Sequence, residues 1–402
     1  MALSGDSIHF NSMTRMGGTL EGEVTYFRTV YVPADKRSSE LLLNKYGLKA
    51  IVPLDMALGI DRLPFKISPQ MMLDIARRAV NASSYEELQE TYALDWHIDI
   101  SDDQIRRVTN YIGQMVYEND CVRRDIAMQH LQWLNTTPIR YAPVNNHVLY
   151  IEMDGVMFNT RKQENNSTWK ENKLGLVFSS KDLKTYRTQK GEEIRRIGKR
   201  EYVSYAGPAD TFKEFLYSAA FRNGLEEHGK IVIISDGARW IKNFKDIYCK
   251  GLDVVHILDY SHMKENVYKF ANAHIRGKNA KGIWAEKLCD LIKNGKTQEA
   301  IAMASEYKDK KQPGIPNIYT YLEKNKDCIN YPEYVAAGFF IGSGAIESGH
   351  KSTMQERMKL PGMRWDLTSA QYDLSAKMKY DSGRWESEVV PLLYQKLGLV
   401  VR

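Results

Sequence analysis

The chain of 402 residues has few cysteines, and no two of them are closely spaced. They are Cys121, Cys249, Cys289 and Cys328, and no C-x-x-C occurs. Cysteine-based zinc ribbons need closely spaced pairs, and small disulfide scaffolds are dense in cysteine, so this spacing argues against both. We therefore expect a reduced protein of the cytoplasm.

A membrane segment and a signal peptide are also lacking. The first residues, MALSGDSIHF, do not place a basic stretch before an apolar one. The longest uncharged apolar run near the C-terminus, residues 334–346, has 13 residues, whereas a bilayer-spanning helix needs about 20. We expect no membrane partner. The hydrophobic share of 43% indicates a folded chain, and the length favours two or three domains.

Positive charge is concentrated in two stretches of the chain. The net charge is only +6, but residues 161–200 hold 12 Lys/Arg against 5 Asp/Glu, and residues 264–311 hold 11 against 6. Such clusters are typical of proteins that bind nucleic acid. A solvated lysine face has the same composition, so charge alone leaves both interpretations open.

The pattern of apolar residues predicts a multidomain α/β protein. Residues 1–66 are β-rich, with a strand-like run at 23–32. Residues 67–140 are helical, and capping boxes at Ser84 and Ser101 predict helices near 85–93 and 102–118, a helix-turn-helix-like unit for DNA binding or dimerisation. Residues 141–260 read strand, strand, strand, helix, strand, helix, strand, which predicts a mixed sheet flanked by helices. A lysine-rich helical stretch follows, and residues 361–402 form a helical tail.

Three acidic residues stand out within this pattern. Asp154 and Asp236 each follow an apolar strand-like run and precede a glycine. An unpaired carboxylate at the end of a buried strand is costly, and a divalent cation shared by two neighbouring carboxylates offsets that cost. Each Asp-Gly is alternatively a simple turn. Glu347 closes the apolar run GFFIGSGAIE, where it either points into a site or stabilises a helix N-terminus.

These residues carry a resemblance to a known family. Asp154 in YIEMDG, Asp236 in IISDGARWI and Glu347 in IGSGAIESGHK resemble the triad of DDE transposases with an RNase H-like core, most closely the groups near the Mutator-like superfamily. Asp259 and His262 match the (C/D)xxH motif that these families tend to carry. GHKSTMQERMKLPGMRW and DSGRWE resemble C-terminal signatures of bacterial insertion-sequence transposases. The match covers residues 145–390, and the Cys-rich zinc-binding segment with which related transposases often begin is not present.

The resemblance implies a fold and a chemistry. We expect an RNase H-like catalytic domain over residues 141–360, with a helical insertion at about 263–332 before the last catalytic residue. Asp154, Asp236 and Glu347 would be catalytic and would bind two Mg²⁺ (or Mn²⁺) ions about 4 Å apart. Asp259 and His262 would be accessory ligands or simply a hydrogen-bonded pair. Water, and then a 3′-OH, would be the nucleophiles that cut the insertion-sequence ends and join them to target DNA.

The partner implied is double-stranded DNA, both the transposon ends and the target. Residues with chemistry suited to DNA lie in three places, and two tryptophans could stack on a base or pack in the core. They are Arg195, Arg196, Lys199 and Arg200; Lys351, Arg357 and Lys359; Gln104 and Arg107; and Trp169 and Trp240. We expect a homodimer or higher oligomer, associated with the bacterial nucleoid. Two alternatives stay open: an RNase H-like structure-selective nuclease, and a non-catalytic DNA-binding protein derived from a transposase.

Overall fold

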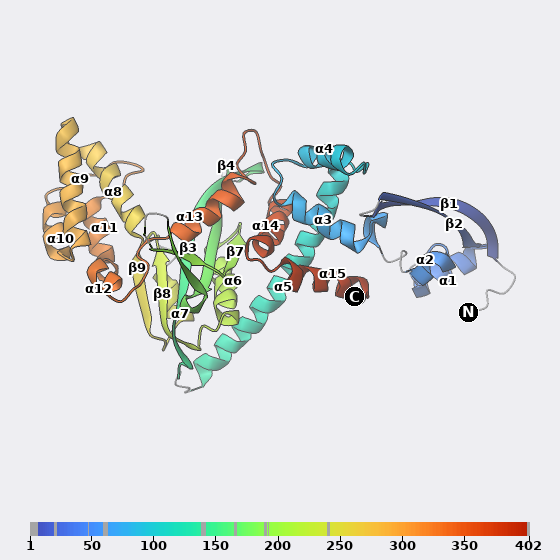
Figure 1. Ribbon diagram of the computed structural model, residues 1–402, viewed down its shortest axis with the longest axis horizontal. Coiled ribbons are helices and arrows are strands. Elements are labelled where there is room, and N and C mark those ends of the chain that lie inside the picture. The colour runs from blue at the N-terminus through green and yellow to red at the C-terminus, as the bar shows by residue number, and fades with distance from the viewer. Residues whose placement is uncertain are drawn as a thin grey trace. The chain divides into compact units, whose positions relative to one another are not determined.

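The computed structural model describes residues 7–19, 22–46, 48–58, 63–137, 142–164, 167–188, 191, 193–238 and 242–399. Contacts divide the chain into two compact units, one formed by residues 1–117 and 384–402 and the other by residues 118–383. Figure 1 labels the elements of both. No helix in the described ranges is both long enough and apolar enough to cross a membrane.

The first unit begins with a hairpin and continues as helices. Strands β1 (Ser7–Thr19) and β2 (Gly22–Pro33) pair antiparallel, which confirms the strand predicted at 23–32. The helical elements are α1 (Lys36–Tyr46), α2 (Pro53–Leu58), the 3₁₀ helix η2 (Pro64–Lys66), α3 (Pro69–Ala79), α4 (Tyr85–Asp95), the π-helix η6 (Trp385–Val389) and α15 (Val390–Leu397).

Side-chain caps fix where two helices of this region begin. The hydroxyl of Ser84 accepts a hydrogen bond from Glu87 N at 3.1 Å, and that of Ser101 accepts one from Gln104 N at 3.2 Å. Both predicted helix starts are therefore confirmed. Helix α5 (Asp102–Thr136) does not end near residue 118 as expected but runs for 35 residues. No glycine or proline follows in its sequence until residue 138, and Ala127 and Leu131 pack into the core of the second unit.

A five-stranded mixed sheet forms the centre of the second unit, as the sequence predicted. Its strands are β3 (Asn145–Glu164), β4 (Ser167–Ser179), β7 (Glu201–Tyr205), β8 (His228–Ser235) and β9 (Val254–Leu258). The order across the sheet is β7-β4-β3-β8-β9. Strands β7, β4 and β3 pair antiparallel, whereas β8 runs parallel to both β3 and β9.

Helices cover both faces of this sheet. The end of α5, α6 (Ala209–Arg222) and α7 (Lys242–Tyr248) pack on the face that carries Leu149, Ile151 and Met153. The opposite face carries Tyr150, Leu174 and Ile234, and α13 (Gly344–His350) contributes Ile346 to the same core. The π-helix η5 (Lys351–Gln355) and α14 (Leu367–Asp381) follow α13.

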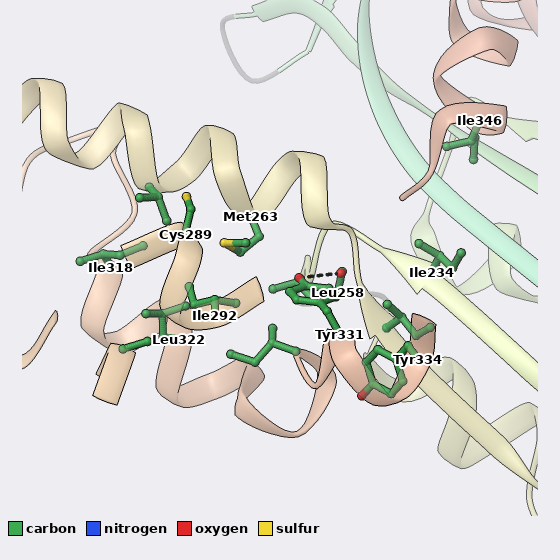
Figure 2. Close-up of a cluster of buried hydrophobic side chains, with 14 of the residues drawn as sticks. Ile234, Leu258, Met263, Cys289, Ile292, Ile318, Leu322, Tyr331, Tyr334 and Ile346 are labelled. Atoms are coloured by element: carbon green, nitrogen blue, oxygen red, sulfur yellow. Dashed lines mark hydrogen bonds between the residues drawn. The ribbon is translucent and has the colours of Figure 1, made fainter. Parts of the chain in front are cut away.

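The helical insertion lies beyond β9, at the edge of the sheet (Figure 1). It contains α8 (Tyr260–His274), α9 (Lys278–Lys293), α10 (Thr297–Ser305), α11 (Ile318–Asn325), the 3₁₀ helix η4 (Lys326–Cys328) and α12 (Tyr331–Ala336). Figure 2 shows Met263, Cys289, Ile292, Ile318 and Leu322 packed together, with Tyr331 Oη donating to Leu258 O at 3.0 Å. The insertion therefore shares one core with the sheet.

Both ends of the insertion are joined by hydrogen bonds. Asp259, at its start, accepts from Ser343 N at 3.2 Å and also from the Ser343 hydroxyl, although the two residues are 84 positions apart. Tyr260 N donates to Ile341 O at 2.9 Å. The chain thus leaves and re-enters the sheet region at one point.

A short hairpin between β4 and β7 was not predicted. After the 3₁₀ helix η3 (Ser180–Asp182), strands β5 (Leu183–Arg187) and β6 (Glu193–Ile197) pair antiparallel outside the central sheet. The arginines expected to contact phosphate lie on this hairpin and just after it.

Candidate active site

Asp154 within β3, Asp236 directly after β8 and Asp259 directly after β9 lie at the same level of three neighbouring parallel strands. Met153 of β3 pairs in register with Ser235 of β8, and Ser235 pairs with Leu258 of β9. The next residue on each strand is an aspartate: Asp154, Asp236 and Asp259. Residues that pair in register on parallel strands lie at the same height along those strands. The three carboxylates therefore form a row at the carboxyl ends of β8 and β9 and at the matching position of β3.

Asp154 lies within β3 rather than at its end, which corrects the expectation from the sequence. The strand continues because it stays paired with β4 as far as Asn159, although its parallel pairing with β8 ends at Met153. The Asp154 Oδ1 accepts from Gly155 N at 2.7 Å, and its Oδ2 lies 3.2 Å from His350 Nε2. Burial raises the pKa of Asp154, but the imidazole of His350 and the Gly155 N–H outweigh it and hold the pKa below its usual value.

Asp236 forms a turn directly after β8. Its Oδ1 accepts from Ala238 N at 2.8 Å, and Gly237 between them has a φ of 80°, which a residue with a side chain adopts only with strain. The local contacts of Asp236 are therefore those of a turn, and its role in a site stays a prediction. Burial raises the pKa of Asp236, and the charge of Asp154 raises it further. This electrostatic coupling follows from the position of the two residues on adjacent strands.

Glu347 reaches the row from α13. Its carboxylate, the carboxylate of Asp259 and the ring of His262 each place one ligand atom within 4.8 Å of the others. Asp259 is fully buried and caps α8, and it accepts from His262 Nδ1 at 3.0 Å. That hydrogen bond raises the pKa of His262 to about 9, against the opposing effect of burial, and the charges of Asp154 and Asp236 add to the rise.

Two residues of this cluster were missed in the sequence. Glu152 is 1% exposed and accepts from Ile346 N at 3.0 Å. Burial raises its pKa to about 8, and the charges of Asp259 and Glu347 contribute. Alternation along a strand puts Glu152 on the same face as Asp154, and a spacing of three puts His350 on the same helix face as Glu347. Both periodicities were visible in YIEMDG and IESGHK.

Most of these basic residues lie on or after the β5–β6 hairpin or are exposed after Glu347, but one of those expected to bind DNA is buried. Arg195 and Arg196 lie on β6, Lys199 and Arg200 follow it, and Lys351 and Lys359 are exposed after Glu347. Arg357 is not at the surface: it is 2% exposed, and its Nη2 lies 2.8 Å from Asp373 Oδ2. We therefore leave Arg357 out of the proposed DNA contacts.

The remaining candidates belong to other parts of the chain. Gln104 and Arg107 lie in the first turns of α5 in the first unit, where Arg107 Nε is 2.8 Å from Asp103 Oδ2. Trp169 lies on β4 and is 49% exposed. Trp240 falls outside the described residues. The roles of all these residues stay predictions.

The donor set at the carboxylate row suits a hard divalent cation. Carboxylate oxygens are the ligands that Mg²⁺ and Mn²⁺ prefer, and the charge of Asp154 helps to raise the pKa of Asp236. A cation would relieve that repulsion. The residues present therefore fit the metal ions expected from the sequence.

The fold and site define a mixed α/β protein with a group of acidic residues where the parallel pairing of β3, β8 and β9 ends. Residues 11–366 match the model of UPF0236, described as an uncharacterised protein family, and the chain belongs to this family. No curated protein matches its sequence. Among solved structures, the chain is similar to the Drosophila P element transposase strand transfer complex, with a TM-score of 0.34 and 9% identity over 89% of this chain and 100% of that one. Function is therefore argued from the site.

Proposed function

We propose that this protein is a DDE transposase of a bacterial insertion sequence, close to the Mutator-like superfamily, with an RNase H-like catalytic domain. The observation that supports the proposal is the parallel register of β3, β8 and β9, which sets Asp154 beside Asp236 and Asp236 beside Asp259, whose ligand atom lies within 4.8 Å of those of Glu347 and His262. The motifs around these three residues support the same assignment. The alternative of unrelated turns and caps does not account for Glu347 lying within 4.8 Å of Asp259 and His262, although these residues are distant in the sequence.

In this proposal Asp154, Asp236 and Glu347 hold two Mg²⁺ or Mn²⁺ ions, with Asp259 and His262 as accessory residues. The ions supply activation of the attacking oxygen and stabilisation of charge on the phosphate. His350 orients the Asp154 carboxylate through its 3.2 Å contact. Ser343 and the Asp259 cap hold the start of α13 against the start of α8 and so position Glu347.

The proposal is tested by DNA cleavage with purified protein. A labelled duplex that carries the DNA flanking the gene should be cut in Mg²⁺ or Mn²⁺, leave a 3′-OH, and be joined to a target duplex. Chelation with EDTA should abolish both products. Cleavage without joining would favour the structure-selective nuclease, and binding without cleavage would favour the DNA-binding protein.

The basic hairpin gives a second test. Replacing Arg195, Arg196, Lys199 and Arg200 by Ala should weaken binding to duplexes of any sequence, because each lost phosphate contact lowers the slope of log affinity against log salt by about 0.9. The measurement is a salt titration followed by fluorescence anisotropy. The matched control changes the three arginines to Lys, which keeps the charge and should keep most of the slope. An unchanged slope in the Ala variant would show that these residues are only a solvated surface.

A further inference from the structure

A cavity of about 440 Å³ opens next to the carboxylate row, between the β5–β6 hairpin and α13. We name it the arginine pocket. Arg195, Arg196 and Arg200 line one part, and Phe178, Tyr202 and Phe340 supply aromatic surface. Its volume lies within the range of about 300–1,000 Å³ found for small-molecule sites. A space of this size holds one nucleotide and not a duplex.

The three guanidinium groups that line the pocket make no ion pair with any carboxylate of the described residues. Arg195 donates to Gly338 O at 3.3 Å, and Arg200 donates to Ile197 O at 3.4 Å. Arg196 lies over the ring of Tyr186 at 5.3 Å. The Nε of Arg200 is buried and has no hydrogen-bond partner among these residues. Asp381 interacts electrostatically with Arg200, but none of the three guanidinium groups forms an ion pair with a carboxylate of the described residues, so they can bind an anion from outside the chain.

Aromatic rings lie beside these charges. The guanidinium of Arg195 is 5.9 Å from the ring centre of Phe340, and that of Arg200 is 5.5 Å from the ring centre of Tyr202. Phe340 is itself supported by Tyr150 at 5.2 Å between ring centres. Aromatic rings next to arginines recognise a nucleobase by stacking while the arginines hold its phosphate. Phosphate alone would need no such rings.

The pocket is lined by residues that neighbour the acidic residues in the sequence. Ala345 and Ser348 line it, and Glu347 belongs to the same helix. Glu152 also lines it, and Asp154 follows two residues later on the same face of β3, about 7 Å along the strand. A DNA strand that reached the carboxylates would therefore place a neighbouring nucleotide at the pocket.

We propose that the arginine pocket holds one unpaired nucleotide of the DNA strand on which the carboxylates act. The inference rests on the proposed function and adds the form of the substrate, namely DNA with a nucleotide out of the duplex stack. Extruding a nucleotide from the duplex stack costs free energy, and this cost is least where the base is already unpaired. DNA that already has an unpaired end should therefore bind best.

The test measures binding without cleavage, in EDTA. Fluorescence anisotropy compares a blunt duplex, a duplex with a short thymidine tail at either end of a strand, and the same tailed duplex with abasic sites. We expect one tail to strengthen binding about tenfold through stacking of its base. The abasic tail should bind like the blunt duplex. Equal affinity for all three would overturn the inference.

Variants distinguish binding in the arginine pocket from a general effect of positive charge on DNA binding. Arg196→Gln should remove most of the preference for the tail, and Phe340→Leu should remove it while the melting curve shows a folded protein. Arg187→Gln is the matched control, because Arg187 is on the same hairpin and 77% exposed but does not line the pocket. It should leave the tail preference unchanged. An equal loss in the Arg187 and Arg196 variants would reduce the pocket to surface electrostatics and overturn the inference.

Three further outcomes are informative. Free thymidine monophosphate that binds as tightly as the tailed duplex would overturn the assignment to a DNA strand in favour of a free nucleotide. A missing tail preference together with metal-dependent cleavage would reject the pocket alone and leave the proposed function standing. A tail preference without cleavage would reject the proposed chemistry alone.

Discussion

Glu347→Gln is expected to lose at least about 1,000-fold of strand cleavage in Mg²⁺ while it keeps the fold and the DNA affinity. The substitution preserves size and hydrogen bonding but removes a charge that would hold a metal ion, and metal stabilisation of the phosphate is worth several kcal/mol. Asp154→Asn and Asp236→Asn should behave alike. Because the three serve one centre, a double variant should be scarcely worse than a single one. The assay is cleavage of the labelled end duplex, with an anisotropy titration and a melting curve for each variant.

The matched control is Glu333→Gln. Glu333 is an exposed acid in the first turn of α12, just as Glu347 is an exposed acid in the first turn of α13. Loss of a helix-start charge costs about 0.3–1 kcal/mol of stability in either place. Only the Glu347 variant should lose cleavage. Wild-type cleavage by Glu347→Gln would refute the transposase proposal.

Asp373→Leu is expected to lower the free energy of unfolding by about 3–5 kcal/mol, because it leaves the buried charge of Arg357 without its partner. Asp373 is fully buried, and Arg357 also lies over the ring of Trp365 at 4.9 Å. Arg357→Met should cost a similar amount, because it removes the guanidinium group that lies 2.8 Å from the buried Asp373 carboxylate. Denaturant titration followed by tryptophan fluorescence gives both values.

A double variant and an exposed pair complete this test. Arg357→Met with Asp373→Leu removes both charges and should recover much of the lost stability. The exposed pair Arg187–Glu193, with side chains 77% and 59% exposed, should contribute less than about 1 kcal/mol. The folded double variant should also bind DNA with an unchanged salt slope, since Arg357 is buried. A reduced slope would return Arg357 to the set of phosphate contacts.

The sequence predicted those helix starts that depend on contacts between residues close together in the chain. Ser84 and Ser101 each cap a helix through a hydrogen bond that spans three residues, so the sequence contains everything needed to place those helix starts. The β5–β6 hairpin was missed because its strands are almost wholly exposed and show no alternation of apolar and polar residues. Its stabilisation comes from pairing between the two strands, which no single strand reveals.

The acidic cluster was partly predictable for a similar reason. The order of elements implied that the strands before Asp154 and Asp236 could be neighbours, and the parallel register makes them so. Glu347 stood out as the acid that closes an apolar run, but its catalytic role came from the resemblance, since nothing within residues 236–347 says where the chain returns. Arg357 was expected at the surface because the sequence around it shows no partner. Its buried partner, Asp373, lies 16 residues away on α14. A side chain's environment depends on such distant partners, and sequence spacing does not report them.

The hydrogen bonds that join the two ends of the helical insertion affect how the insertion can vary in length within the family. Asp259 and Ser343 hold the two ends of the insertion together, as do Tyr260 and Ile341. The length of the insertion can therefore change without moving the acids on either side, provided that the core it shares with the sheet is kept. A chimera that keeps Asp259, Tyr260, Ile341 and Ser343 and replaces the helices between them would retain the same row of carboxylates.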